Sequence, residues 1–479
     1  MPSDGQTVER LRDYLRTLKP EARAMLLAEL ERTMLRGDED AGNELVLAEL
    51  RRAIRAERLQ VKRIGDAARL FFAPIEPFFV DDGADHKRIG RIARAAVEPI
   101  WEWIGRDLMP AETKALTEDI HRALLANDRA KADQVTRALH ERALQRIAAT
   151  IAAVSDDEKA RRRLGVQVGT PRALEDIGTL SRILVIRDVL ADLARQLPSR
   201  IHSFEGDQVE QVKRLLEDAT AIKSGGNREA RTADIFLFGV ILVLGRLSAP
   251  WQLIRLATRA AGSDDTLRIA ETPWAVAVTI VLGEIEAMVS ELHGELKAHR
   301  SVVSLLRSLH DAVRGLRTEM DLSVESPWSR RLAAVRTEIS NLLKAEIETT
   351  PGRVRRLLRP RPAKDIAPGS LLDSIEVADA ELLVEFVGAC RTYANELAVN
   401  EVTMRTFSDL QYYLESGTRV LLDSLRHAGD ADRPFRQSQV AAAIRFCRTV
   451  FGGDYAGLLA KAADIAVQTA APDRKPLRA

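Results

Sequence analysis

Two groups of acidic and histidine side chains have the residue types that hold metal ions. The first is the segment DDGADH, with Asp81, Asp82, Asp85 and His86 as candidate ligands. Their spacing fits no calcium-binding loop, because the glycine and the terminal glutamate of such a loop are misplaced here. A turn whose aspartates cap the next helix explains the segment more simply.

The second group is Glu291, His293, Glu295 and His299. On a helix the two glutamates and His299 would share one stripe, four residues apart. Di-metal carboxylate proteins need a Glu-x-x-His pair on each of two helices, and the sequence shows no such pair with matching partners. Solvent-facing charge is therefore the favoured interpretation, and the sequence predicts neither a metal site nor a cofactor.

No catalytic motif is recognisable in the chain. It lacks a GxxxxGK[ST] phosphate loop as well as the GxGxxG, GxSxG and HExxH patterns. Cys390 and Cys447 fall on apolar helical faces, as small core residues do, and two cysteines suit a reducing compartment. No catalytic residue is predicted, although an enzyme whose site is assembled from distant residues stays an alternative.

One dense run of positive charge occupies residues 351–364, PGRVRRLLRPRPAK. Its cations are Arg353, Arg355, Arg356, Arg359, Arg361 and Lys364, and it contains three prolines. Arginines on a flexible stalk could hold phosphates of nucleic acid or anionic lipid, but aromatic residues that stack on bases are missing from the run. We favour a solvated linker, with anion binding as the functional alternative.

An aromatic segment at residues 69–82, RLFFAPIEPFFVDD, is a second recognition candidate. Four of the twelve phenylalanines fall in it: Phe71, Phe72, Phe78 and Phe79. Pro74 and Pro77 cannot both lie inside a helix without cost, so we expect an irregular connector. A loop packed into the core is the favoured interpretation, and a partner-binding patch is the functional alternative, since exposed aromatic clusters bind partners.

The elements that must position these residues are helices. Nearly every segment has apolar residues at helical spacing, and no run shows convincing strand alternation. A heptad seam runs through Val302, Leu306, Leu309, Val313, Leu316 and Met320. We therefore predict an all-α fold, a multi-domain or elongated helical-bundle array with a long antiparallel hairpin of about residues 296–322 against 327–348.

Composition shifts and turn signals suggest where the domains end, since 479 residues exceed one ordinary core. We predict an N-terminal bundle region at 1–164 and a helical connector at 165–224. A central region at 225–350 and the basic linker at 351–364 would then lead to a C-terminal bundle at 365–470.

The most apolar stretches, residues 235–247 and 274–283, decide between a protein core and a membrane segment. Both are shorter than the about 20 residues that span a bilayer. Arg246, Glu284 and Glu286 at their ends would be costly in lipid unless paired. We predict that both runs are covered by the chain's own helices. A membrane-associated protein using these runs and the Arg-rich linker is the alternative.

The overall charge limits the partners of the chain. A net charge of +1 excludes a global electrostatic grip on nucleic acid, so nucleic acid or anionic lipid could bind only through residues 351–364. The N-terminal residues lack the apolar segment of a secretory signal, which leaves the cytoplasm as the expected location. We predict a non-catalytic helical interaction or scaffold protein whose partners are mainly proteins.

Overall fold

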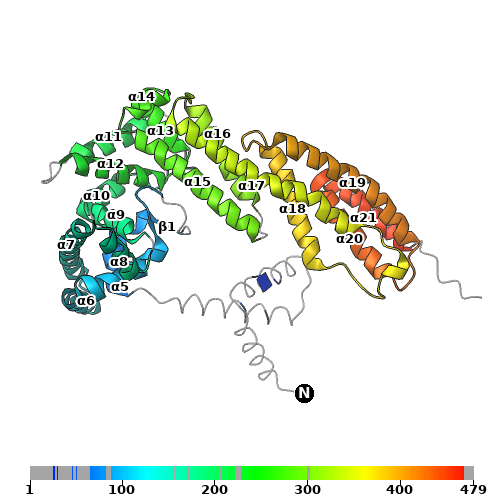
Figure 1. The fold of residues 1–479 in the computed structure, drawn as a ribbon, viewed down its shortest axis with the longest axis horizontal. Helices are drawn as coiled ribbons and strands as arrows, with labels where there is room; N and C mark the ends of the chain where they lie inside the picture. Colours follow the sequence, from blue (N-terminus) through cyan, green and yellow to red (C-terminus); the bar gives the residue numbers. More distant parts are fainter. Residues whose placement is uncertain are drawn as a thin grey trace, which may run out of the picture. The chain divides into compact units, whose positions relative to one another are not determined.

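The structure, a computed structural model, describes residues 65–81, 88–155, 157–170, 172–204, 207–221, 228–298 and 302–468, together with Met25, Leu26, Leu30, Val46 and Leu50. Over these residues it contains eighteen α-helices and two strands of two residues each (Figure 1). The predicted all-α fold is therefore confirmed. The remainder of the predicted N-terminal bundle before residue 65 lies outside the described residues.

The chain divides into two compact units, and each is built from two stretches of sequence. The first contains residues 1–73 and 104–142, and the second contains residues 74–103 and 143–479. The predicted region 1–164 is thus shared between the units, because the chain leaves the first unit after residue 73 and returns to it at residue 104. The sequence pattern marks turns along the chain, and it does not show which segments return to one another.

The described part of the first unit consists of α4 (Asp66–Phe72), a π-helical turn η3 (Ile104–Leu108), α6 (Pro110–Leu125) and the beginning of α7 (Arg129–Val154). Helix α6 starts with Pro110, where a missing N–H costs no hydrogen bond. His140 on α7 is buried, and its Nε2 donates to the carbonyl oxygen of Phe71 at 2.8 Å. This bond ties α7 to the end of α4.

The second unit opens with short elements. These are η1 (Ala73–Phe78), β1 (Phe79–Val80), β2 (Ile92–Ala93), η2 (Arg94–Ala96) and α5 (Val97–Trp103). The two strands pair in parallel, with Phe79 opposite Ile92 and Val80 opposite Ala93. A strand of two residues is too short to show alternation, which is why the sequence does not reveal it.

Eight helices then lead to the middle of the chain, and α12 lies among them as a core helix. They are α8 (Glu158–Val168), α9 (Ala173–Val185), α10 (Arg187–Gln196), α11 (Gln208–Ala221), α12 (Arg228–Leu244), α13 (Gln252–Ala261), α14 (Thr266–Ala270) and α15 (Ala275–Lys297). Helices α9, α10, α11 and α15 all pack on α12. A helix covered on several sides must be apolar around its circumference, as residues 235–244 are.

Both apolar runs are buried by protein, as predicted. Phe238 on α12 and Val278 on α15 are 0% exposed, and Trp274 is 5% exposed. None of the helices in the described ranges combines the length and the apolar character needed to cross a membrane.

The acidic residues that follow the second apolar run are paired within the chain. Glu284 accepts a hydrogen bond from Arg88 at 2.5 Å, and Arg91 lies 3.8 Å from its other oxygen. Glu286 accepts two hydrogen bonds from the guanidinium of Arg331, at 2.5 and 2.6 Å. These partners satisfy the carboxylates at the edge of the core.

The last six helices include a bundle that is coloured yellow to red in Figure 1. They are α16 (Val303–Glu319), α17 (Pro327–Leu358), α18 (Ser374–Tyr393), α19 (Asn400–Arg426), α20 (Arg433–Phe451) and α21 (Gly453–Gln468). Helices α17 to α20 all pack on one another, and α21 covers α19 and α20. Helix α17 starts as expected, with Ser326 as its N-cap and Pro327 in its first turn.

The predicted hairpin differs from the observed packing. Residues 296–322 belong to two helices, since α15 ends at Lys297 and α16 begins at Val303. The seam of α16 is buried as predicted, but its main neighbours are α13, α15 and α18, while α17 packs on α15, α18, α19 and α20. A heptad pattern shows that one face of a helix is covered, and it does not show which helix covers it.

Helices α13 and α16 approach each other closely at Gly315. A Cβ at this position would lie 2.5 Å from Cδ2 of Trp251, the residue that precedes α13. The contact leaves no room for a methyl group. Arg255 holds the same two helices together, because its Nε donates to Glu319 at 2.9 Å.

We expect Gly315→Ala to lower the free energy of unfolding by about 1–3 kcal/mol, since overpacking outweighs the better helix propensity of alanine. Urea denaturation followed by circular dichroism measures the change. Gly294→Ala on α15 is the matched control, because nothing lies within 4 Å of the added Cβ. If Gly315→Ala proved as stable as this control or more stable, α13 and α16 would have to separate easily at Trp251.

Candidate functional site

The four phenylalanines of the aromatic segment lie inside the protein. Phe71 and Phe78 are 0% exposed, Phe72 is 4% exposed and Phe79 is 9% exposed. The rings of Phe71 and Phe72 meet edge to face at 5.1 Å, and Phe78 meets Phe238 of α12 in the same way at 5.3 Å. This placement favours the connector packed into the core, since the rings offer little surface to a partner.

Only part of each candidate metal group belongs to the residues that the structure describes. Asp81 forms an ion pair with Arg94 at 2.8 Å, and Glu291 and His293 are exposed on α15. The members that lie outside the described residues are Asp82, Asp85, His86 and His299. Across the described ranges, no three histidine, cysteine, aspartate or glutamate side chains come together as metal ligands would.

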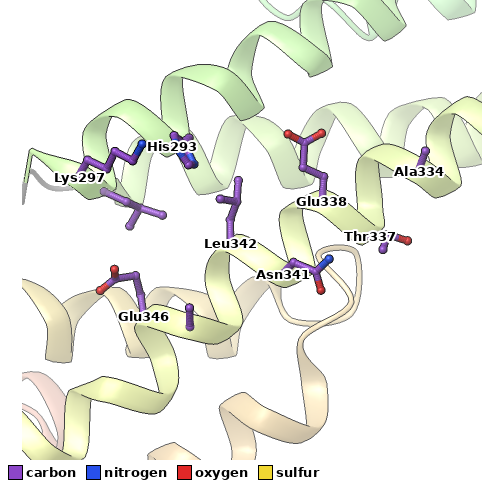
Figure 2. A pocket seen from close by; sticks show the side chains of 10 residues that line it. His293, Lys297, Ala334, Thr337, Glu338, Asn341, Leu342 and Glu346 are labelled. Atoms are coloured by element: carbon purple, nitrogen blue, oxygen red, sulfur yellow. The ribbon is translucent and has the colours of Figure 1, made fainter.

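An open groove of about 540 Å³ between α15 and α17 contains His293 (Figure 2). Its polar lining includes Glu338 and Glu346 of α17, and Leu342 lies between these two carboxylates. Eight residues of helix separate the carboxylates by about 12 Å along the axis. Neither carboxylate forms an ion pair with the imidazole of His293, so the described residues of the groove show no assembled acid–base pair.

Both cysteines are buried core residues, as predicted. Burial raises the pKa of Cys390 far above its ordinary value. Burial also raises the pKa of Cys447 to about 11, and a contact with the hydroxyl of Thr418 offsets only part of this effect. Neither thiol ionises near neutral pH, so neither is an activated nucleophile.

The basic residues 351–364 do not form a flexible stalk. Helix α17 continues through Pro351 to Leu358, which places Arg353, Arg355 and Arg356 on its last turns. Cations there interact favourably with the negative end of the helix dipole. Arg359 continues the chain in an extended conformation, and a 3₁₀ turn η4 (Ala363–Asp365) follows.

Helix α20 holds this basic segment in place. The buried amide of Gln439 donates to the carbonyl oxygens of Leu357 at 3.1 Å and Arg359 at 3.0 Å. Arg436 donates to the carbonyl oxygen of Arg361 at 3.4 Å. The solvated linker expected from the prolines and charges is therefore a segment docked on the bundle, through partners that lie far away in sequence.

Neighbouring helices also supply the aromatic rings that the basic segment lacks. The guanidinium of Arg355 lies 5.6 Å from the ring centre of Tyr413 on α19, and that of Arg361 lies 5.0 Å from Phe435 on α20. Burial raises the pKa of Tyr413, and the nearby charge of Arg355 opposes this only partly, so the phenol stays neutral. Both rings are covered by arginine side chains.

A larger cleft, of about 1140 Å³, opens between helices α9, α11, α12 and α13 and the start of α15. Its apolar floor contains Phe236 and Trp274, whose rings meet edge to face at 5.0 Å. Trp274 is buried, whereas Phe236 keeps part of its surface exposed. The two apolar runs therefore form the core and also present an aromatic side chain to this cleft.

Small side chains and charges of both signs also line the cleft. Alanines line the cleft from two helices: Ala233 on α12, and Ala260 and Ala261 on α13. The charged lining residues are Arg182, Lys213, Glu217 and Glu229. Arg182 is fixed by Asp234, which accepts a hydrogen bond from its Nε at 2.8 Å.

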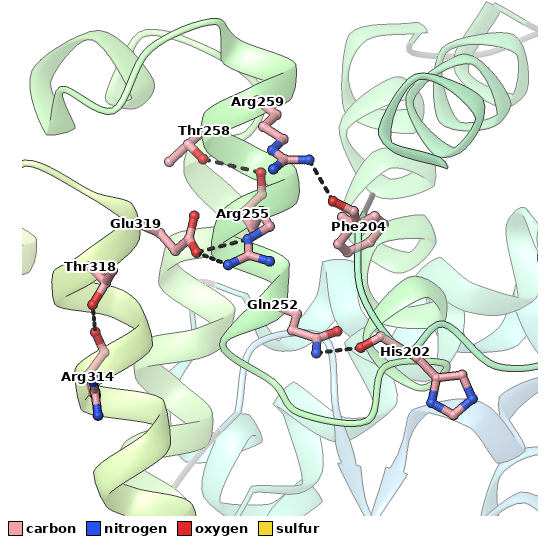
Figure 3. A network of polar contacts seen from close by, with 9 residues as sticks. All are labelled: His202, Phe204, Gln252, Arg255, Thr258, Arg259, Arg314, Thr318 and Glu319. Carbon is pink, nitrogen blue, oxygen red and sulfur yellow. Dashed lines mark hydrogen bonds and ion pairs between the residues drawn. The ribbon is translucent and has the colours of Figure 1, made fainter. Parts of the chain in front are cut away.

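A network of polar contacts holds the α13 wall of the cleft (Figure 3). The side-chain amide of Gln252 donates to the carbonyl oxygen of His202 at 2.6 Å, and Arg259 donates to that of Phe204 at 2.6 Å. On the opposite side, Arg255 donates to Glu319 of α16. Because α13 is tied to neighbours on two sides, the cleft exists before any partner binds.

No protein-family model, curated protein or solved structure matches the chain. Its possible roles must therefore be argued from its own residues. Sequence reasoning missed the cleft because its walls come from helices far apart along the chain. The only signal was the aromatic content of residues 235–247 and 274–283, which was interpreted as core.

We expect Phe78→Ala to lower the free energy of unfolding by about 3–5 kcal/mol, because it removes a fully buried ring from its contact with Phe238. Chemical denaturation measures this loss. Val324→Ala is the control, since Val324 is 88% exposed and its truncation should change stability by less than about 0.5 kcal/mol. A Phe78 variant as stable as the control would restore the idea of an exposed recognition patch.

We expect the folded protein to resist thiol labelling at pH 8, because burial keeps both cysteines protonated and covered. In denaturant, the thiols of Cys390 and Cys447 should both react with a disulfide reagent that releases a coloured product. The raised pKa of Cys447 also means that the unfolded thiol ionises first as pH rises. The free energy of unfolding should therefore fall as the pH rises from about 9, the pKa of the unfolded thiol, to about 11, the pKa of the folded one. Rapid labelling of one thiol in the native protein would contradict this interpretation.

Proposed function

We propose that this chain is a non-catalytic helical interaction protein that binds a protein partner in the cleft formed by α9, α11, α12, α13 and the start of α15. The observation that supports the proposal most strongly is the combination of a partly exposed aromatic floor, small alanine walls and a rim of mixed charge. Protein interfaces share this organisation, with an apolar anchor at the centre and polar groups around it.

The charges of the rim favour a protein partner over nucleic acid. Arg182 and Lys213 are positive, whereas Glu217 and Glu229 are negative. A nucleic-acid surface would instead concentrate positive charge along the phosphate backbone. The mixed rim suits a polypeptide segment that places an aliphatic or aromatic side chain over Phe236 and carries charges of both signs on either side.

The cleft is large enough to hold part of a polypeptide segment. Its volume of about 1140 Å³ is near the upper end of the roughly 300–1,000 Å³ of ordinary small-molecule pockets. Its titratable lining residues come from three helices, α9, α11 and α12, and Arg182 is already paired with Asp234. The floor therefore acts as an anchor site, and the rim selects the register of the bound segment.

We place this activity in the cytoplasm. Both cysteines remain free thiols in the structure, as is usual for a protein of a reducing compartment.

We expect the double variant Ala233→Arg with Ala260→Arg to lose its protein partner, because two long side chains would fill the cleft above Phe236. Affinity capture from the native cell followed by mass spectrometry identifies the candidate. Titration with the purified partner should then show at least about a tenfold loss of affinity, which corresponds to about 1.4 kcal/mol.

The matched control is Ala153→Arg with Ala333→Arg, which adds the same side chains at exposed alanines outside the cleft. It should bind like the unmodified protein, and thermal melting should show that both double variants are folded. A partner captured equally by all three proteins would bind elsewhere, and the cleft would then not be its site.

A further inference from the structure

The connection between α17 and α18 is held firmly against the bundle along much of its length. Beyond the bonds from Gln439, the backbone N–H of Gly369 donates to the carbonyl oxygen of Ala431 at 3.2 Å. The N–H of Leu372 donates to the hydroxyl of Ser438 at 3.0 Å. Because these contacts order the connection in advance, a ligand that binds there loses little conformational entropy on binding.

Positive charge exceeds negative charge on this connection. Residues 353–375 contain six cations and two carboxylates, Asp365 and Asp373. Arg356 pairs with Glu376 at 3.3 Å. Within the described ranges, the exposed side chains of Arg359 and Lys364 have no acidic partner within 4.0 Å.

Two exposed aliphatic side chains accompany these cations. Leu371 is 65% exposed and Ile375 is 63% exposed. Ile375 precedes Glu376, the partner of Arg356 on α17, so it lies near the end of that helix. Leu371 precedes Leu372, whose N–H donates to Ser438 of α20, the helix that also holds Arg359 through Gln439.

We propose that residues 353–375 form a membrane-binding surface for anionic lipid. The cations contact the lipid phosphates and carboxylates, and Leu371 and Ile375 enter the boundary between headgroups and acyl chains. Electrostatic attraction and apolar insertion are individually weak, and together they give stable peripheral binding. This surface is separate from the proposed protein-binding cleft and does not depend on it.

The side chains beside the cations favour a membrane over nucleic acid. Single-stranded nucleic acid needs free aromatic faces on which its bases stack. Arg355 lies over the ring of Tyr413, and Phe435 is 3% exposed beneath Arg361. The strongly exposed apolar groups of residues 353–375, Leu371 and Ile375, are aliphatic, which suits lipid chains. The membrane alternative combined the two apolar runs with the Arg-rich linker, and because the runs are buried, this proposal keeps only the Arg-rich part.

The test is sedimentation of the full chain with vesicles of phosphatidylcholine alone and with vesicles that also contain phosphatidylserine. We expect binding only to the anionic vesicles, and it should weaken as salt is added. Arg359→Ala with Lys364→Ala should reduce binding roughly 25-fold, since each cation near such a surface contributes about a factor of five. Leu371→Ser with Ile375→Ser should reduce it by at least about tenfold.

The control variant changes exposed residues of the same kinds on α8, with Lys159→Ala, Arg163→Ala and Val166→Ser. It should bind anionic vesicles like the unmodified chain. Equal binding to neutral and anionic vesicles would overturn the proposal. A second outcome would also overturn it, in favour of nucleic acid. The chain would bind a single-stranded oligonucleotide more tightly than anionic vesicles, and the charge variant would lose this binding while the aliphatic variant kept it. Neither result bears on the cleft.

Discussion

The requirement to cover α12 determines the arrangement of the central helices. Its apolar residues extend around the helix, so no single neighbour can bury them. Helices α9, α10, α11 and α15 pack on it, and Gly239 allows close approach, since a Cβ there would lie 2.6 Å from Leu216 on α11. The cleft is a consequence of this packing, because it opens beside Phe236, where the cover is incomplete.

The sequence predicted the features that depend on local pattern. Helical spacing predicted the fold class, and Ser326 with Pro327 predicted the start of α17. The seam of α16 was correctly assigned as buried. In each case the physical cause lies within a few residues, because capping and amphipathicity act over one or two turns of helix.

The features that were missed depend on contacts between distant residues. Pro351 and the neighbouring arginines suggested a linker, but α17 continues through them and Gln439 fixes the chain that follows. The aromatic connector has the composition of a recognition patch, and only its packing shows that Phe78 is covered. The cleft likewise needs helices that are adjacent in space, which composition and periodicity do not indicate.

Helix α17 links two groups of helices within the second unit. One part of it packs against α15, and it also contributes to the bundle with α18, α19 and α20. Its 32 residues span about 48 Å, and Pro351 lies inside the helix, where it removes one backbone hydrogen bond. A pull applied to the C-terminal bundle would therefore reach the central helices along a single helix, and the turn around Pro351 would be its weakest point.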